Sequence, residues 1–185
     1  MISYLSRITI NPLSSNNLTN ISLLPQFNDH ILQAKSNFSF LGVINQSAPN
    51  HYDWQVTVCF YTALHLVNAH LSKFNQQYRN HKDVNYALSP YNVASPMKIP
   101  ENVYTSYEAL FSLSRRARYL INMKDDNLGS DTPFFTNERH LSKSIRHLEL
   151  LFDYFDTLYG IGFTKIPLKC TLVTNKNAFR FFDIL

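Results

Sequence analysis

The side chains of this chain that could do acid–base chemistry on a phosphate group are its histidines and arginines. His51 and His65 flank a mostly apolar run, His81 follows it, and three arginines crowd positions 115, 116 and 118. Cleavage of RNA without a metal needs a base for the 2′-hydroxyl, an acid for the leaving oxygen and a cation for the charge on phosphorus. Histidine and arginine can supply these functions, so these side chains are candidates for such chemistry.

The site residues can be assigned on the condition that the two helices expected to carry them pack side by side. The candidate catalytic residues are then His51, His65, Arg115 and Arg118. The candidate substrate contacts are His81, Arg116, Tyr119 and His147. No metal and no cofactor are expected, because the chain has no Gly-rich phosphate loop, no H-E-x-x-H motif and no E-x-x-H pair.

Two segments carry motifs that belong together. The first reads His51-Tyr52-Asp53-Trp54 and then Phe60-Tyr61-Thr62-Ala63-Leu64-His65, and the second reads Ser114-Arg115-Arg116-Ala117-Arg118-Tyr119. In this combination they resemble the HEPN family, in which a helix with H-Y-D-W and F-Y-x-A-L-H precedes a helix ending S-R-x-A-R-Y. The resemblance covers about residues 27 to 122.

The resemblance implies a helical bundle, frequently dimeric, that serves as a ribonuclease toxin, an antiviral effector or a noncatalytic RNA- or nucleotide-binding partner. Active members place an R-x4-6-H motif near the start of the last core helix. The nearest pair here, Arg139 and His147, is eight positions apart, which exceeds that spacing and spans more than two helical turns. The usual ribonuclease motif of the family is therefore missing.

Each candidate residue also has a structural interpretation. Asp53 can serve the first turn of its helix and form a buried pair with Arg118, and this reading is preferred because a buried charge persists only when it is paired. His65 lies within an apolar stretch, where a core histidine is common. Tyr119 can anchor the core or a dimer, and His147 can lie on a solvated face.

The chain has 185 residues, of which 45 % are hydrophobic, so it can bury one sizeable core. We expect an N-terminal extension over 1–24, a helical bundle over 25–160 and a C-terminal tail over 161–185. Charged residues make up 16 % and aromatic residues 14 %, a balance that favours some aromatic packing against a second subunit. The net charge of +4 is compatible with nucleic acid but does not establish it.

The apolar spacing predicts an all-α fold, a four- or five-helix HEPN-like bundle with short terminal extensions. Helices are expected from Phe27 to about Asn45, from a cap at Asn50 to Leu71, from Glu101 to Met123 and from Asn137 to Gly160, with a short helix at His81–Leu88. The second helix is apolar on nearly every face and should be central. A short strand within Ile166–Thr174 is expected to pair with Ile2–Ile10.

The chain has only two cysteines, no convincing signal peptide and no apolar run of membrane-spanning length, so a cytoplasmic location without membrane contact is expected. Two hypotheses remain open. In the first, the protein is a homodimer that acts on or binds RNA or a nucleotide, with a cognate antitoxin or a defence protein as partner. In the second, it is a noncatalytic dimerisation or protein-interaction module.

Overall fold

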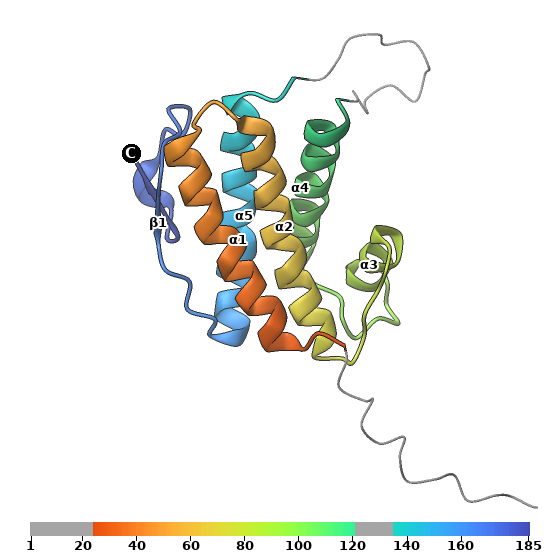
Figure 1. Ribbon diagram of the computed structural model, residues 1–185. Helices are drawn as coiled ribbons and strands as arrows, with labels where there is room; N and C mark the ends of the chain where they lie inside the picture. The colour runs from red at the N-terminus through yellow and green to blue at the C-terminus, as the bar shows by residue number, and fades with distance from the viewer. Residues whose placement is uncertain (1–23, 121–134) are drawn as a thin grey trace, which may run out of the picture.

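The protein is described from a computed structural model, which covers residues 24–120 and 135–185. These residues form five α-helices and a two-stranded parallel sheet near the C-terminus (Figure 1). The predicted all-α bundle with a small β pairing is therefore confirmed. No helix in the described ranges combines the length and the apolar character needed to cross a bilayer.

Four long helices make the bundle, and a short one lies beside it. Their bounds are Phe27–Ser47 for α1, Tyr52–Ser72 for α2, His81–Leu88 for α3, Glu101–Tyr119 for α4 and Glu138–Tyr159 for α5. Helix α2 packs against α1, α4 and α5, and α4 also packs against α5 (Figure 1). The short helix predicted at His81–Leu88 is confirmed, and the predicted continuation of α4 to Met123 lies outside the described residues.

The start of α2 differs from the prediction by one residue. Asn50 was the expected cap, but the N-cap is His51, whose side chain makes no capping hydrogen bond. The amide of His51 donates to the carbonyl of Ala48, which closes a tight turn and places Asn50 before the helix. Asp53 still lies in the first turn, where a carboxylate is favoured by the helix dipole.

Helix α5 begins and ends as its sequence predicts. The side chain of Asn137 accepts from the amide of Arg139, and the amide of Asn137 donates to Nδ1 of the His140 ring. Gly160 ends the helix with φ +61, a left-handed conformation that glycine adopts without a steric cost. These two signals therefore set the ends of α5.

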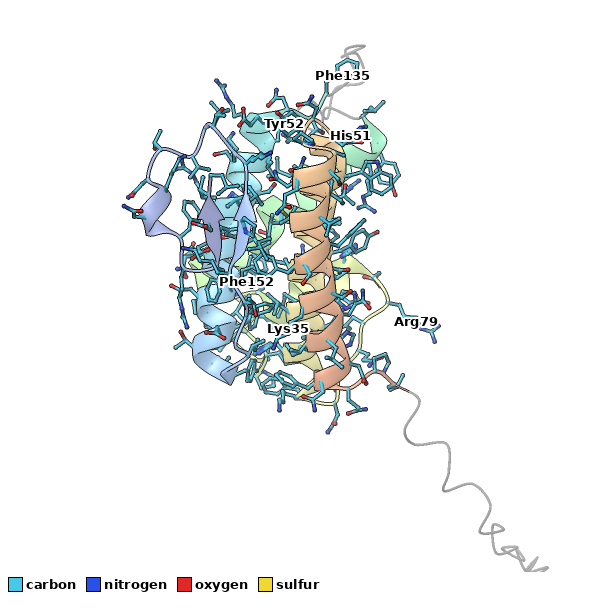
Figure 2. The ribbon with its side chains drawn as sticks, turned by 60° about the vertical axis from the view of Figure 1, so that its left-hand side comes forward. Lys35, His51, Tyr52, Arg79, Phe135 and Phe152 are labelled. Carbon is cyan, nitrogen blue, oxygen red and sulfur yellow. The ribbon has the colours of Figure 1, made fainter. Side chains whose placement is uncertain are left out.

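The C-terminal segment packs along α1 and α5 and completes the core. Strand β1 (Ile166–Leu168) pairs in parallel with β2 (Phe182–Ile184), and a 3₁₀ turn, η2, spans Lys176–Ala178 between them. The predicted partner strand, Ile2–Ile10, lies outside the described residues. Phe152 of α5 lies between the helices and this segment (Figure 2), in ring contact with Phe181 and Phe182.

A buried amide network fastens this segment to the helices. Asn45 at the end of α1 donates to Gln55 of α2 at 2.8 Å and to the carbonyl of Lys169 at 2.9 Å, and it accepts from the Lys169 amide at 2.6 Å. Gln55 in turn donates to the carbonyl of Pro49 at 2.8 Å. Both side chains are buried, so one primary amide joins two helices and the C-terminal chain.

We predict that Asn45→Ala lowers the free energy of unfolding by roughly 2–4 kcal/mol, because it leaves buried groups of Gln55 and Lys169 without partners. Urea denaturation followed by circular dichroism measures the change. The neighbouring exposed Gln46→Ala is the matched control and should shift the free energy by less than about 0.5 kcal/mol. Equal effects for the two variants would contradict the assigned role of the network.

Candidate functional site

Arg118, in the last turn of α4, faces α2 rather than the solvent beyond the helix end. Its Nε donates to the carbonyl of Ser114 at 3.2 Å and its Nη2 to the Ser114 hydroxyl at 3.3 Å. Its Nη1 donates to the hydroxyl of Tyr61 on α2 at 3.4 Å. These contacts hold the guanidinium group in one orientation at the junction of the two helices.

Aromatic rings surround the same guanidinium group. Its central carbon lies 5.3 Å from the ring centre of Tyr119, 5.8 Å from that of Tyr61 and 5.9 Å from that of Phe60. Cations are attracted to aromatic faces at these distances. Phe60 is buried, whereas Tyr61 and Tyr119 are 38 % and 60 % exposed, so the group is enclosed on one side and open on the other.

His81, the first residue of α3, joins this cluster through two rings. Its imidazole centre lies 4.3 Å from the ring of Phe111 and 5.5 Å from the ring of Phe60. Arg115 packs on the same Phe111 ring, with its guanidinium carbon 5.5 Å from the ring centre. The two phenylalanines therefore place His81 next to both arginines, and we call Tyr61, His81, Arg115, Arg118 and Tyr119 the α2–α4 cluster.

The surroundings of His81 keep its ring neutral. Burial lowers the pKa of the imidazole below its usual value, and the positive charges of Arg118 and Arg115 lower it further. Nδ1 is enclosed and has no hydrogen-bond partner among the described residues. A neutral imidazole beside two cations can accept a proton from a bound ligand, which is the chemistry of a general base.

The preferred structural pair of the sequence analysis is not formed. The ion pairs within 4.0 Å in the described part of the chain are those of Arg180 with Asp153 and Asp156, and Asp53–Arg118 is not among them. Asp53 lies eight residues before Tyr61, about 12 Å along the helix. The Arg118 side chain points back toward the start of α4. Because α2 runs antiparallel to α4, this direction brings the side chain alongside Tyr61 and not alongside the start of α2.

The other two candidate catalytic residues lie away from the cluster. His51 is exposed at the start of α2, at one end of the bundle (Figure 2), about 13 Å along the helix from Phe60. His65 turns toward α1, where its Nδ1 is 3.2 Å from Nδ1 of His30. The ring centres are 5.5 Å apart, so the two nitrogens point almost straight at each other and share one proton.

Arg116 of α4 and His147 of α5 lie on the α4–α5 side of the bundle. Burial lowers the pKa of His140 on α5, and the positive charges of Lys143 and then of Arg116 lower it further. His147 Nδ1 is hydrogen bonded to the Ser106 hydroxyl at 3.2 Å. His147 and Ser106 line an open groove of about 720 Å³ between α4 and α5, with Arg146 at its rim. The predicted substrate contacts are thus divided, with His81 and Tyr119 in the α2–α4 cluster and these two outside it.

Sequence reasoning missed how much the aromatic residues contribute to the site. Neither Tyr61 nor Phe111 was among the predicted site residues, yet these two residues connect the arginines to α2 and α3. Phe111 and Arg115 are four positions apart on one helix, a spacing that places side chains together. That spacing is the signal from which this part of the site was predictable.

His70 shows what a structural histidine looks like in this fold. Its Nε2–H donates to the carbonyl of Met97 at 2.9 Å, so Nδ1 accepts from the Tyr159 hydroxyl at 2.7 Å. The residue is buried, and burial lowers its pKa. His70 has a partner for each ring nitrogen and therefore joins α2, the loop before α4 and the end of α5, whereas His81 has no such partners among the described residues.

Comparison of the chain with protein-family models, with curated proteins and with solved structures finds no match. Among the described residues, no group of three or more histidine, cysteine, aspartate or glutamate side chains is arranged to hold a metal ion. The function is therefore inferred from the geometry of the α2–α4 cluster.

We predict that the protein loses stability as the pH falls through about 6.5. The histidines whose pKa is lowered in the fold are His30, His65, His70, His81, His140 and His147. The unfolded chain therefore binds more protons than the folded chain below the ordinary histidine pKa, which favours unfolding. Each histidine that the fold keeps neutral at pH 5.5 lowers the free energy of unfolding by roughly 1.4 kcal/mol.

Urea denaturation at pH 7.5 and 5.5 tests this expectation, and the free energy of unfolding should drop by at least about 1 kcal/mol. A His70→Gln variant should show a smaller drop, because one buried histidine is removed. Glu149, whose pKa is raised chiefly by burial, acts in the opposite direction, because it makes the folded chain bind more protons than the unfolded chain as the pH falls. Unchanged or higher stability at pH 5.5 would refute the argument.

Proposed function

We propose that this chain is a HEPN-like, RNA-associated protein that binds RNA through the α2–α4 cluster. The observation that carries the proposal is the pair of guanidinium groups of Arg115 and Arg118. Within the described residues neither lies within 4.0 Å of a carboxylate, and both lie against aromatic rings. Arginines held in place but without an acidic partner are suited to phosphate oxygens.

The cluster matches the chemistry of a single-stranded RNA. Phosphates would meet the two arginines, and unpaired bases would stack on the exposed rings of Tyr61 and Tyr119. The net charge of +4 adds a general attraction for nucleic acid. A role in a bacterial toxin–antitoxin or antiviral defence system, with an antitoxin or defence protein as partner, is proposed on the family resemblance.

We predict that Arg118→Gln weakens binding of a single-stranded RNA oligonucleotide by about tenfold, because one charge-assisted phosphate contact is lost. Fluorescence anisotropy at 50 and 200 mM salt measures the affinity. Loss of a phosphate contact should also reduce the slope of log affinity against log salt by about 0.7.

Arg139→Gln is the matched control, because it removes the same charge from an exposed position on α5. It should change affinity by less than about twofold at 200 mM salt, where distant charges are screened. The proposal fails if the unaltered protein does not bind RNA, or if the two variants lose affinity equally.

A second candidate function is a dimerisation module, and a specific surface favours it. Leu32, Phe40 and Val43 on α1 and Trp54 on α2 are each at least half exposed. After Asp29, the α1 sequence contains a single charged residue, Lys35. The Lys35 ammonium group donates to the carbonyl of Ile161, on a different side of the helix. Two copies of this basic chain can therefore meet along α1 without like-charge repulsion.

If this surface binds a second copy, the protein is a dimer and Phe40→Asp makes it monomeric, because a charge would be buried without a partner in each subunit. Size-exclusion chromatography with light scattering measures the mass. Leu172→Asp, a similar change on the exposed C-terminal segment, should leave the dimer intact. A monomeric unaltered protein, or a dimer that survives Phe40→Asp, would rule out this interface.

A further inference from the structure

We propose that Ser106 and His147 form a nucleophile–base pair that hydrolyses esters of aliphatic acids in the groove between α4 and α5. This activity is separate from the proposed RNA binding, because neither residue belongs to the α2–α4 cluster and the reaction involves no phosphate. The two residues come from helices that the bundle packs together, α4 and α5. Their side chains are hydrogen bonded, with the Ser106 oxygen 3.2 Å from Nδ1 of His147.

The hydroxyl of Ser106 is committed to His147 rather than to the backbone of its own helix. Serine and threonine hydroxyls within helices often donate to the carbonyl four residues earlier. Thr105 does so, with its hydroxyl 2.7 Å from the carbonyl of Glu101, whereas the hydrogen bond of the Ser106 hydroxyl in the described structure is with His147. Ser106 is largely buried but lines the groove, so a ligand that fills the groove contacts it.

His147 has the charge state of a base. Burial lowers the pKa of its imidazole, and the positive charge of Lys143 lowers it further. The ring is therefore neutral at pH 7, and with its own proton on Nε2 it accepts from the Ser106 hydroxyl through Nδ1. A hydroxyl held against a neutral imidazole can give up its proton as it attacks a carbonyl carbon, which is how serine becomes a nucleophile.

The first turn of α4 supplies donors for the negative charge that develops on the carbonyl oxygen. Side chains of a helix point back toward its N-terminus, so the Ser106 hydroxyl is directed toward this turn. The helix begins at Glu101, and the amides of Glu101 and Asn102 form no hydrogen bond within the described structure. Both residues line the groove. Free amides at the positive end of the helix dipole are suited to stabilise an oxyanion.

The groove continues into a second hollow that suits an aliphatic acyl chain. Asn102 and Leu150 line both spaces, which have volumes of about 720 and 510 Å³ and therefore adjoin. The other apolar or aromatic residues that line the second hollow are Pro100, Val103, Tyr154 and Leu158. Its one acidic lining residue, Asp153, is paired with Arg180. A neutral ester can therefore place its carbonyl group at Ser106 and its apolar chain in the second hollow.

The reaction balances with the ester, the two side chains and water. The Ser106 proton passes to Nδ1 of His147 while Oγ forms a bond to the carbonyl carbon. The bond from that carbon to the alcohol oxygen then breaks, and His147 returns the proton to the departing alcohol. Water next gives a proton to His147 and attacks the acyl carbon, and the bond to Oγ breaks as the proton returns to Ser106. The products are a free carboxylic acid and an alcohol.

The experiment uses the full chain, without RNA, and measures hydrolysis of p-nitrophenyl butyrate from the release of p-nitrophenol. We expect a rate above that of the buffer alone. Ser106→Ala and His147→Gln should each slow hydrolysis by about 100-fold, because the nucleophile or its base is lost. A fluorophosphonate probe, which reacts covalently with activated serines, should label Ser106, as identified by mass spectrometry of peptides, and should label it far more slowly in His147→Gln.

Thr105→Ala is the matched control, since it removes the neighbouring hydroxyl that lines the same groove but donates to Glu101, and it should leave the rate unchanged. Thermal unfolding of each variant shows whether the fold is kept, and Ser106→Ala, which removes a single oxygen atom, serves if His147→Gln does not fold. The inference is overturned if the unaltered protein neither hydrolyses the ester nor takes up the probe at Ser106, or if hydrolysis persists in Ser106→Ala. Either result leaves the proposed RNA binding standing.

Discussion

Burial of α2 is the constraint on which the rest of the structure depends. Its buried residues include Val56, Cys59, Ala63 and Val67 on one side and Val58 and Thr62 on another. A helix with so many buried faces must be surrounded, and α1, α4 and α5 supply that cover. Among the described residues of α2, Trp54 and Tyr61 are the most exposed, and Tyr61 belongs to the proposed RNA-binding cluster.

The packing around α2 also determines which histidine nitrogens have hydrogen-bond partners within the protein. His65 shares a proton with His30, and His70 satisfies both of its ring nitrogens, so both are committed to holding helices together. His81 enters from the loop after α2 and packs on phenylalanine rings that offer no hydrogen bonds. Its Nδ1 is therefore enclosed without a hydrogen-bond partner in the described structure, which costs stability.

The C-terminal segment accounts for most of the acidic side chains of α5. Asp153 and Asp156 pair with Arg180, and Glu149 accepts from the amides of Arg180 and Phe181. These carboxylates are thereby paired with the C-terminal segment, which Figure 1 shows on the side of the bundle away from α3 and α4. Arg115 and Arg118 have no acidic partner within 4.0 Å in the described structure.

The sequence by itself determined the helices and the class of the fold, because helix periodicity, the Asn137 cap and the Gly160 stop are local signals. It also identified α2 as central and the arginines of α4 as the densest positive cluster. Only the tertiary structure decided which histidine meets those arginines, since the direction of a side chain depends on how neighbouring helices cross. For the same reason Arg118 meets Tyr61 and not Asp53, and β1 pairs with a strand that arrives from the end of the chain, contacts that no local pattern encodes.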